Sequence, residues 1–142
     1  MDCLFCAFLA DPEPPIHTVL RDEVALAFLD HRPLFPGHLL VVPVAHVPTL
    51  TELPAELVGP FFDRVRRLTG ATERAMAARG SFVAMNNRVS QSVPHLHVHV
   101  VPRNPKDGLR GFFWPRRRYA DEAEASRTAD LLRAALAADP IG

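Results

Sequence analysis

Apolar and polar positions form distinct blocks in the first third of the chain. Residues 24–29 are apolar and are bounded by charged residues, which predicts a buried strand that ends at Asp30. Residues 31–37 contain two prolines and a glycine and predict a turn. The apolar run 38–43 then predicts a second strand. Together these blocks predict a hairpin with a long connection.

Between residues 60 and 79 the apolar positions take on a helical period. Charged residues, mostly arginine, fill the positions between them, and the apolar positions are Phe61, Val65, Leu68, Ala75 and Met76. Pro60 suits the first turn of such a helix, and Gly80 suits its C-terminal cap. One long amphipathic helix is therefore expected here.

Two more strands and a last helix complete the predicted elements. Residues 81–85 and 95–101 predict strands, and Asp121 is expected to cap a helix whose apolar contacts are Leu131, Leu132 and Leu136. The chain has no internal repeat and no low-complexity linker, so residues 1–142 are expected to form a single domain. The predicted class is α+β: an antiparallel sheet with one long helix and a C-terminal helix.

Composition narrows the functional classes. Hydrophobic residues make up 48% of the chain and charged residues 23%, which is typical of a soluble globular protein. No apolar run approaches the roughly 20 residues that cross a bilayer, and the 16 basic and 16 acidic residues predict no surface for nucleic acid or membrane. The N-terminus lacks the basic segment and long apolar core of a secretion signal, so a cytoplasmic location is expected.

The two cysteines are only three positions apart, at Cys3 and Cys6. A disulfide across so short a loop stabilises little, because the stabilisation grows with loop length. In a cytosolic protein the pair is typical either of half a metal site or of two free thiols.

Three histidines occupy every second position of the last predicted strand, at His95, His97 and His99. Alternate residues of a strand share a face, so adjacent members lie ~6.6 Å apart and the outer two ~13 Å apart at Cα. A single metal ion with bonds of ~2.0–2.1 Å cannot bind all three. The three side chains must therefore have different roles.

Three interpretations of this pattern remain open. The strand is a surface strand that happens to carry histidines, or it is a His-x-His metal clamp, which needs a further ligand nearby although the first acid after His99 is Asp107. Alternatively one imidazole is a nucleophile, because neutral imidazole attacks phosphorus well near its pKa of ~6.5. A neighbouring imidazole then donates to the phosphoryl oxygens.

Residues 91–103, Gln-Ser-Val-Pro-His-Leu-His-Val-His-Val-Val-Pro-Arg, resemble the signature of the histidine triad (HIT) superfamily. That signature is His-φ-His-φ-His-φ-φ preceded by Gln-Ser/Thr-Val. The likeness extends upstream to residues 28–30 and 33–43 and to the Cys-Leu-Phe-Cys of residues 3–6. The resemblance covers residues 3 to about 103, and it implies a HIT-like fold and a homodimer whose long helices and sheets pair across a twofold axis.

The resemblance also implies a reaction. The central histidine, His97, matches the family's nucleophile, and His99 matches the residue that contacts the α-phosphate. Gln91 and Ser92 match positions that hydrogen-bond the phosphate or the oxygen that bridges to the leaving group. The expected function is hydrolysis or transfer at the α-phosphate of a nucleoside 5′-phosphate derivative, an adenosine phosphoramidate or a dinucleoside polyphosphate, through a nucleotidyl-histidine intermediate.

A purine nucleotide is the implied ligand. Asp30 matches the residue that grips the ribose hydroxyls, although such a residue also simply ends a strand. The residues expected in the purine pocket or in the core are Phe5, Phe8, Phe28 and Leu29, and Asn86 resembles the asparagine before the phosphate loop. Here that loop looks about two residues short and lacks glycine, so the alternative function is a catalytically weak purine-nucleotide-binding module.

The cysteine pair also finds partners through the resemblance. In zinc-containing members the ligand positions correspond to Cys3, Cys6, His46 and His95, which implies one structural zinc ion per chain. The alternative is that the thiols are free. The segment 111–119 is rich in aromatic residues and arginine, and it fits either closure over the leaving group or an aromatic anchor before a basic turn.

Overall fold

The computed structural model describes residues 2–110 and 115–139 of the chain. The chain forms two compact units, Met1–Asp107 and Gly108–Gly142, and each is described by itself. Residues 111–114, the aromatic part of the segment noted above, lie outside the described residues. None of the described helices combines the length and the apolar character that crossing a membrane requires.

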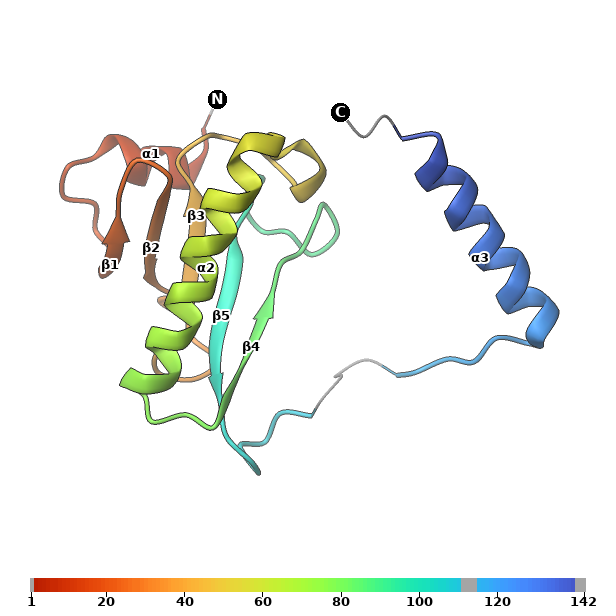
Figure 1. Ribbon diagram of the computed structural model, residues 1–142. Coiled ribbons are helices and arrows are strands. Elements are labelled where there is room, and N and C mark those ends of the chain that lie inside the picture. The colour runs from red at the N-terminus through yellow and green to blue at the C-terminus, as the bar shows by residue number, and fades with distance from the viewer. Residues whose placement is uncertain (1, 111–114, 140–142) are drawn as a thin grey trace. The chain divides into compact units, whose positions relative to one another are not determined.

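The first unit is built around a five-stranded antiparallel sheet (Figure 1). Its strands are β1 (Thr18–Arg21), β2 (Ala25–Leu29), β3 (Leu39–Pro43), β4 (Gly80–Ala84) and β5 (Val98–Arg103), in the spatial order β1-β2-β3-β5-β4. The register pairs Phe28 with Leu40 and Leu40 with His99, so these three residues form a row across the sheet. The α+β class and the antiparallel sheet are thus confirmed.

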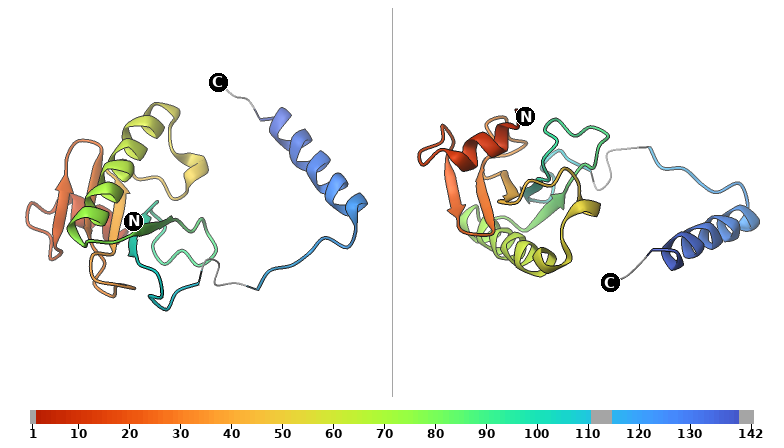
Figure 2. Two further views of the ribbon diagram at one scale, coloured as in Figure 1. Left: turned by 60° about the horizontal axis from the view of Figure 1, so that its bottom comes forward. Right: turned by 90° about the horizontal axis from the view of Figure 1, so that it is seen from above.

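Helices cover both faces of this sheet. The long helix α2 (Ala55–Ala75) lies on one face and the short helix α1 (Leu4–Ala10) on the other, as Figure 2 shows from above. A one-turn 3₁₀ helix, η1 (Leu50–Glu52), precedes α2. Alternate residues of β3 face opposite cores: Val41 packs in the α2 cluster and Val42 in the α1 cluster. Burial on both faces explains why β2 and β3 have continuous apolar runs.

The long helix differs from its predicted bounds at both ends. It begins at Ala55, directly after Pro54, and Pro60 lies inside it, not in its first turn. Its C-terminal cap is not Gly80, which begins β4; instead Ala77 takes a left-handed conformation with a φ of 50°. Hydrogen bonds from the N–H groups of Ala77 and Ala78 back into the last turn complete a Schellman motif there. A non-glycine residue therefore performs the role that the sequence assigned to Gly80.

The triad segment is also less regular than predicted. Strand β5 begins at Val98, so His95 and His97 precede the sheet ladder. The ladder stops because Pro43 of β3 has no N–H, and its carbonyl accepts from Nε2 of His95 at 2.8 Å instead. Leu96 points into the α2 core and its N–H donates to the carbonyl of Val47. The expected alternation, with histidines on one face and apolar residues on the other, holds without a regular strand.

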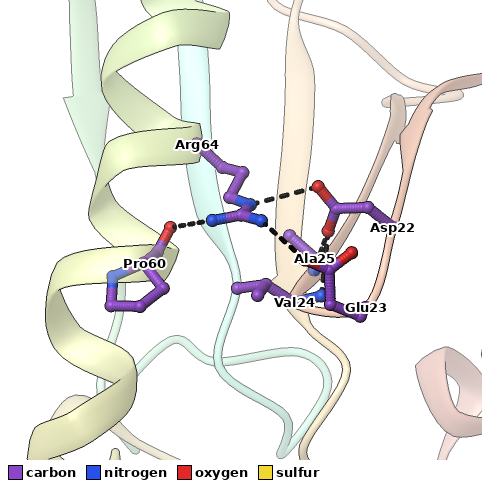
Figure 3. Close-up of polar contacts among 6 residues, drawn as sticks. All are labelled: Asp22, Glu23, Val24, Ala25, Pro60 and Arg64. Atoms are coloured by element: carbon purple, nitrogen blue, oxygen red, sulfur yellow. Dashed lines mark hydrogen bonds and ion pairs between the residues drawn. The ribbon is translucent and has the colours of Figure 1, made fainter.

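A charged contact joins α2 to the turn between β1 and β2 (Figure 3). Arg64 donates from Nε to Asp22 Oδ2 at 3.1 Å and from Nη1 to the carbonyl of Pro60 at 3.0 Å. The other carboxylate oxygen of Asp22 accepts from the N–H groups of Val24 and Ala25. Burial opposes ionisation of Asp22, but these donors outweigh it and lower its pKa. The contact holds the helix against the edge of the sheet.

The second unit contains α3 (Glu122–Ala137). Asp121 caps this helix as predicted, because its side chain accepts from the N–H of Glu124 at 2.8 Å. Within this unit Leu131, Leu132 and Leu136 are 71%, 66% and 63% exposed, so the unit by itself does not supply their expected apolar contacts. The helix therefore begins where its capping residue places it, and the second unit by itself does not bury these leucines.

Candidate functional site

A pocket of about 710 Å³ opens on the α1 face of the sheet. Its lining comes from α1 and the segment after it, from the end of β2, and from the triad segment: Leu4, Phe5, Phe8, Pro15, Ile16, His17, Phe28, Leu29, Asp30, His31, Leu40, Ser92, Val93, His97 and His99. The volume is within the range of sites for small organic ligands. One end of the pocket is aromatic and the other carries the histidines and Asp30.

Aromatic rings build the apolar wall. The ring of Phe28 lies 5.7 Å from that of Phe5 and 5.7 Å from that of Phe8, edge to face in both cases. Leu29 follows Phe28 at the end of β2 and is partly exposed in the pocket. Phe28 and Leu29, two of the four residues considered for the purine pocket, thus lie together in the wall. Phe5 and Phe8, which lie on α1, extend this wall.

His97 is buried, with 3% of its surface exposed, and it lines the pocket. Its Nδ1 lies 2.8 Å from the carbonyl oxygen of His95. Because a carbonyl only accepts, this contact places the ring proton on Nδ1 and leaves the lone pair on Nε2. The central histidine of the triad therefore has the tautomer that a nucleophile requires.

His99 has the opposite tautomer, fixed by a chain of hydrogen bonds. The N–H of Leu34 donates to Nδ1 of His38 at 3.0 Å, so the proton of that neutral ring is on Nε2. Nε2 of His38 lies 2.9 Å from Nδ1 of His99 and donates to it. The proton of His99 is therefore on Nε2. With ring centroids 5.2 Å apart, His97 offers a lone pair and His99 a donor.

The hydrogen bonds from Leu34 through His38 to His99 also argue against a metal clamp. Ligand atoms of Asp30, His38 and His99 all lie within 4.8 Å of one another, a grouping compatible with a metal ion. The proton on Nε2 of His38, however, occupies the atom that would have to bind the metal. The arrangement favours a hydrogen-bond relay. The sequence alone assigns no chemical role to His38; a histidine directly before an otherwise apolar buried strand was the available signal.

Burial keeps these imidazoles neutral. It lowers the pKa of His99 to about 4, with the neighbouring imidazoles of His97 and His38 acting in the same direction. Burial also lowers the pKa of His38, although the carboxylate of Asp30 opposes that shift. Both rings are therefore neutral at pH 7, which agrees with the tautomers assigned above.

Acidification is expected to destabilise the fold between about pH 6.5 and pH 4, in a step that includes His99. In this window an unfolded histidine, with a pKa of ~6.5, binds a proton that folded His99 does not. The free energy of unfolding should therefore decrease as the pH falls, by up to about 1.4 kcal/mol per pH unit for this residue. Urea unfolding of metal-free protein at several pH values measures the slope. His99→Asn should reduce that slope by close to one proton, and an identical slope would contradict the assignment.

Asp30 lies where β2 ends, at the polar side of the pocket. Its Oδ1 accepts from the N–H of Arg32 at 2.9 Å, and its Oδ2 lies 3.6 Å from Nε2 of His38. The carboxylate is thus fixed beside the histidines with acceptor capacity left for a ligand. Ser92 is exposed and lines the same pocket.

Gln91 and Asn86 lie outside the lining of the pocket. The amide of Gln91 donates to the carbonyl of Pro48 at 2.6 Å and accepts from the N–H of Arg88 at 2.8 Å. Asn86 is exposed and donates to the carbonyl of Ser90 at 3.2 Å. Neither residue is among those that line the pocket. Both amides instead organise the loop that precedes the triad.

Two residues of that loop have backbone angles that glycine usually adopts, although the loop contains no glycine. Arg88 and Ser90 have φ values of 67° and 60°, in the left-handed region. Such a conformation costs a non-glycine residue roughly 1–2 kcal/mol, so the surrounding hydrogen bonds must hold it. The absence of glycine noted in the sequence thus results in local backbone strain and not in a different turn.

The four predicted metal ligands lie together. The nitrogen Nδ1 of His95 is 3.4 Å from Sγ of Cys3, 3.6 Å from Sγ of Cys6 and 3.1 Å from Nδ1 of His46. Tetrahedral zinc with bonds of ~2.05 and ~2.3 Å separates two nitrogens by ~3.3 Å and a nitrogen from a sulfur by ~3.6 Å. Nε2 of His95 donates to the carbonyl of Pro43, which leaves Nδ1 unprotonated and directed at the cluster. The donor set and its spacing fit zinc.

Comparison with known proteins places these features in one family. A model of the HIT domain matches residues 11–106. An adenylylsulfatase of Arabidopsis thaliana is 33% identical over 110 residues, 76% of this chain and 55% of that protein, so the chain spans about half of the plant protein's length. An adenosine 5′-monophosphoramidase of Schizosaccharomyces pombe is 31% identical over 117 residues, 81% of this chain and 84% of the relative.

Solved structures agree with the sequence matches. The crystal structure of a zinc-bound histidine triad family protein from Mycobacterium smegmatis is 38% identical to the chain, with a TM-score of 0.70. The similarity covers 96% of this chain and 94% of that one. With its matching domain, its antiparallel sheet and its three histidines, the chain belongs to the HIT domain family.

Proposed function

We propose that this chain cleaves a nucleoside 5′-phosphate derivative at its α-phosphate through a nucleotide bound covalently to His97. The observation that supports this most directly is the pair of opposite tautomers, with a lone pair on Nε2 of His97 and a proton on Nε2 of His99. Relatives named as an adenylylsulfatase and an adenosine 5′-monophosphoramidase support a nucleotide substrate of the same kind.

Binding uses the two ends of the pocket. The purine lies against the wall formed by Phe8, Phe28 and Leu29, where burial of its faces is favourable. The ribose hydroxyls donate to the carboxylate of Asp30, which accepts both. The α-phosphate then lies beside His97, close to the donor of His99.

In the first chemical step, Nε2 of His97 attacks the α-phosphorus and forms a P–N bond. The bond from phosphorus to the leaving group breaks, and the leaving group takes the electron pair and a proton from water at the pocket mouth, near Ser92. The N–H of His99 stabilises the charge that develops on the phosphoryl oxygens. Water then attacks the phosphorus of the nucleotidyl-histidine: a P–O bond forms, a proton of the water passes to the hydroxide left by the first step, and the P–N bond breaks with its electron pair returning to Nε2, which releases the nucleoside monophosphate.

A second function is a binding module with little catalysis. The sequestered amide of Gln91 and the strained loop at Arg88 and Ser90 favour it, because they leave the phosphate with few donors from that loop. The decisive measurement is release of AMP from adenosine 5′-phosphoramidate, diadenosine tetraphosphate and adenylyl sulfate by the purified chain. AMP release from any of them supports the hydrolase, and AMP binding without turnover supports the module. If the chain neither releases nor binds AMP, the pocket is not a nucleotide site.

We also propose one structural zinc ion per chain, held by Cys3, Cys6, His46 and His95. The zinc-bound relative and the ligand spacing support it, and the reduced thiols that it needs are consistent with the cytoplasm, the location that we propose. A closed site of two thiolates and two imidazoles supplies structural stability and leaves no position for substrate. Elemental analysis after purification without chelator should find close to one zinc per chain.

A homodimer is proposed through the β4 edge of the sheet. Among the described strands, β4 pairs with β5 alone, and its Val83 is 43% exposed. An exposed edge strand is a template for pairing with a second strand. Light scattering should give twice the chain mass for the native protein and the single mass for Val83→Asp. The matched control is Val19→Asp on β1, the opposite edge, where Val19 is 53% exposed; it should stay dimeric, and a monomer from both variants or neither would refute this interface.

A further inference from the structure

Helix α1 connects the cysteine–histidine cluster with the nucleotide pocket. Cys3 caps the helix and Cys6 lies in its first turn, and both belong to the cluster. Phe5 lies between them in the chain, and Phe8 follows one turn after it. Both phenylalanines line the pocket. The same seven-residue helix therefore contributes to the metal site and to the purine wall.

Phe5 contacts both sites directly. Its side chain is 4% exposed, and its ring centroid lies 5.8 Å from that of His95 and 5.2 Å from that of His97. On its third side it meets Phe28 at 5.7 Å. The ring thus packs against both a ligand of the proposed metal site and the proposed nucleophile. A shift of Phe5 would change the packing around His97 and the shape of the purine wall together.

His95 provides a second connection. Its Nδ1 belongs to the cluster, and its backbone carbonyl is the acceptor that fixes the tautomer of His97. A metal ion that immobilises the ring of His95 therefore also immobilises the backbone carbonyl that accepts from His97. Within the described residues, the routes through Phe5 and through His95 begin at the same four side chains.

The N-terminal end of α1 depends on the cluster for its position. A helix of seven residues is too short to be stable alone. Its C-terminal end is held by Arg21, which donates to the carbonyls of Leu9 and Asp11 at 2.6 and 2.7 Å. At its N-terminal end, among the described residues, Sγ of Cys3 accepts from the N–H of Cys6 and the two thiols contact His46 and His95; thiols form only weak hydrogen bonds. Bonds to a metal would replace these weak contacts with strong ones.

We propose that occupancy of the Cys3–Cys6–His46–His95 site sets the affinity of the pocket for nucleotide by holding Phe5 in the purine wall, and that it fixes the tautomer of His97 by holding His95. This inference rests on the proposed function. It assigns the metal site a role in ligand binding in addition to stability, and it makes Phe5 a positioning residue for His97.

The test compares the full chain loaded with zinc and stripped by a chelator, with AMP as the probe. Calorimetry should show AMP binding about tenfold weaker without zinc, the size expected when one aromatic wall is lost. Hydrogen exchange should increase in residues 4–10 and stay unchanged in β2, β3 and β5. The ¹⁵N shifts of the His97 ring, which report its tautomer, should move toward those of a mixed population.

Two variants keep the test independent of the stability of the metal-free chain. Zinc-loaded Phe5→Leu should retain its zinc, bind AMP several-fold more weakly and lose part of the dependence on zinc. The matched control is Phe62→Leu, which should leave AMP affinity as in the native chain. Phe62 lies in α2 and packs against the core cluster on the other face of the sheet. Equal AMP affinity with and without zinc, or native affinity in Phe5→Leu, would overturn this inference alone. No AMP binding to the zinc-loaded native chain would overturn the proposed function and this inference with it.

Discussion

His97→Ala is expected to lose at least about 10⁴-fold in turnover, the scale of effect when an enzymatic nucleophile is removed. The other two histidines of the triad cannot replace it, because Nδ1 of His95 faces the cysteine cluster and Nε2 of His99 carries a proton. AMP binding should remain within a few-fold of native, because Phe28 and Asp30 form their part of the pocket without His97. Steady-state kinetics and calorimetry measure the two quantities separately.

Two further observations distinguish loss of the nucleophile from general damage. Imidazole added to His97→Ala should restore part of the turnover, because the buried space left by the side chain admits it. In the native chain, a brief reaction quenched in base should leave a nucleotide on His97, detectable by mass spectrometry. A label on another residue, or near-native turnover by His97→Ala, would overturn the mechanism and favour the binding module.

The apolar runs predicted the central strands well because both faces of β2 and β3 are buried. Val41 and Val42 face opposite helices, so neither face needed polar residues and the runs are continuous. By contrast, β1 has four residues that are mostly exposed, and α1 has seven residues. Both are too short to establish a period of their own. Their positions are set by tertiary contacts, such as Arg21 against the end of α1.

Within the site, the sequence predicted the residues more readily than their states. The spacing of His95, His97 and His99 indicated a division of roles, and the structure brings His97 and His99 to the pocket and His95 to the cysteines. The tautomers were beyond reach of the sequence, because they depend on the carbonyl of His95 and on the N–H of Leu34. Backbone groups of this kind carry no signature in the residue types.

His38 provides the test of that backbone-derived assignment, and His38→Ala is expected to lower kcat by about 10²-fold, as when a donor to a developing oxyanion is lost. Without Nε2–H of His38, nothing fixes the proton of His99 on its own Nε2. KM should change little, because the purine wall and Asp30 stay in place. Removal of the neighbouring imidazole and entry of water should also raise the pKa of His99 from about 4. The titration of the His99 ring, followed by NMR, should therefore move to higher pH.

The conservative variant separates this relay from packing. In His38→Gln a single amide offers one acceptor for the N–H of Leu34 and one donor for Nδ1 of His99, so it reproduces both hydrogen bonds of the imidazole. It should recover most of the native kcat, whereas His38→Phe fills the space without either bond and should lower kcat as His38→Ala does. If Gln and Phe impair turnover equally, His38 acts by packing alone. If neither does, the tautomer of His99 is fixed by something other than the chain from Leu34.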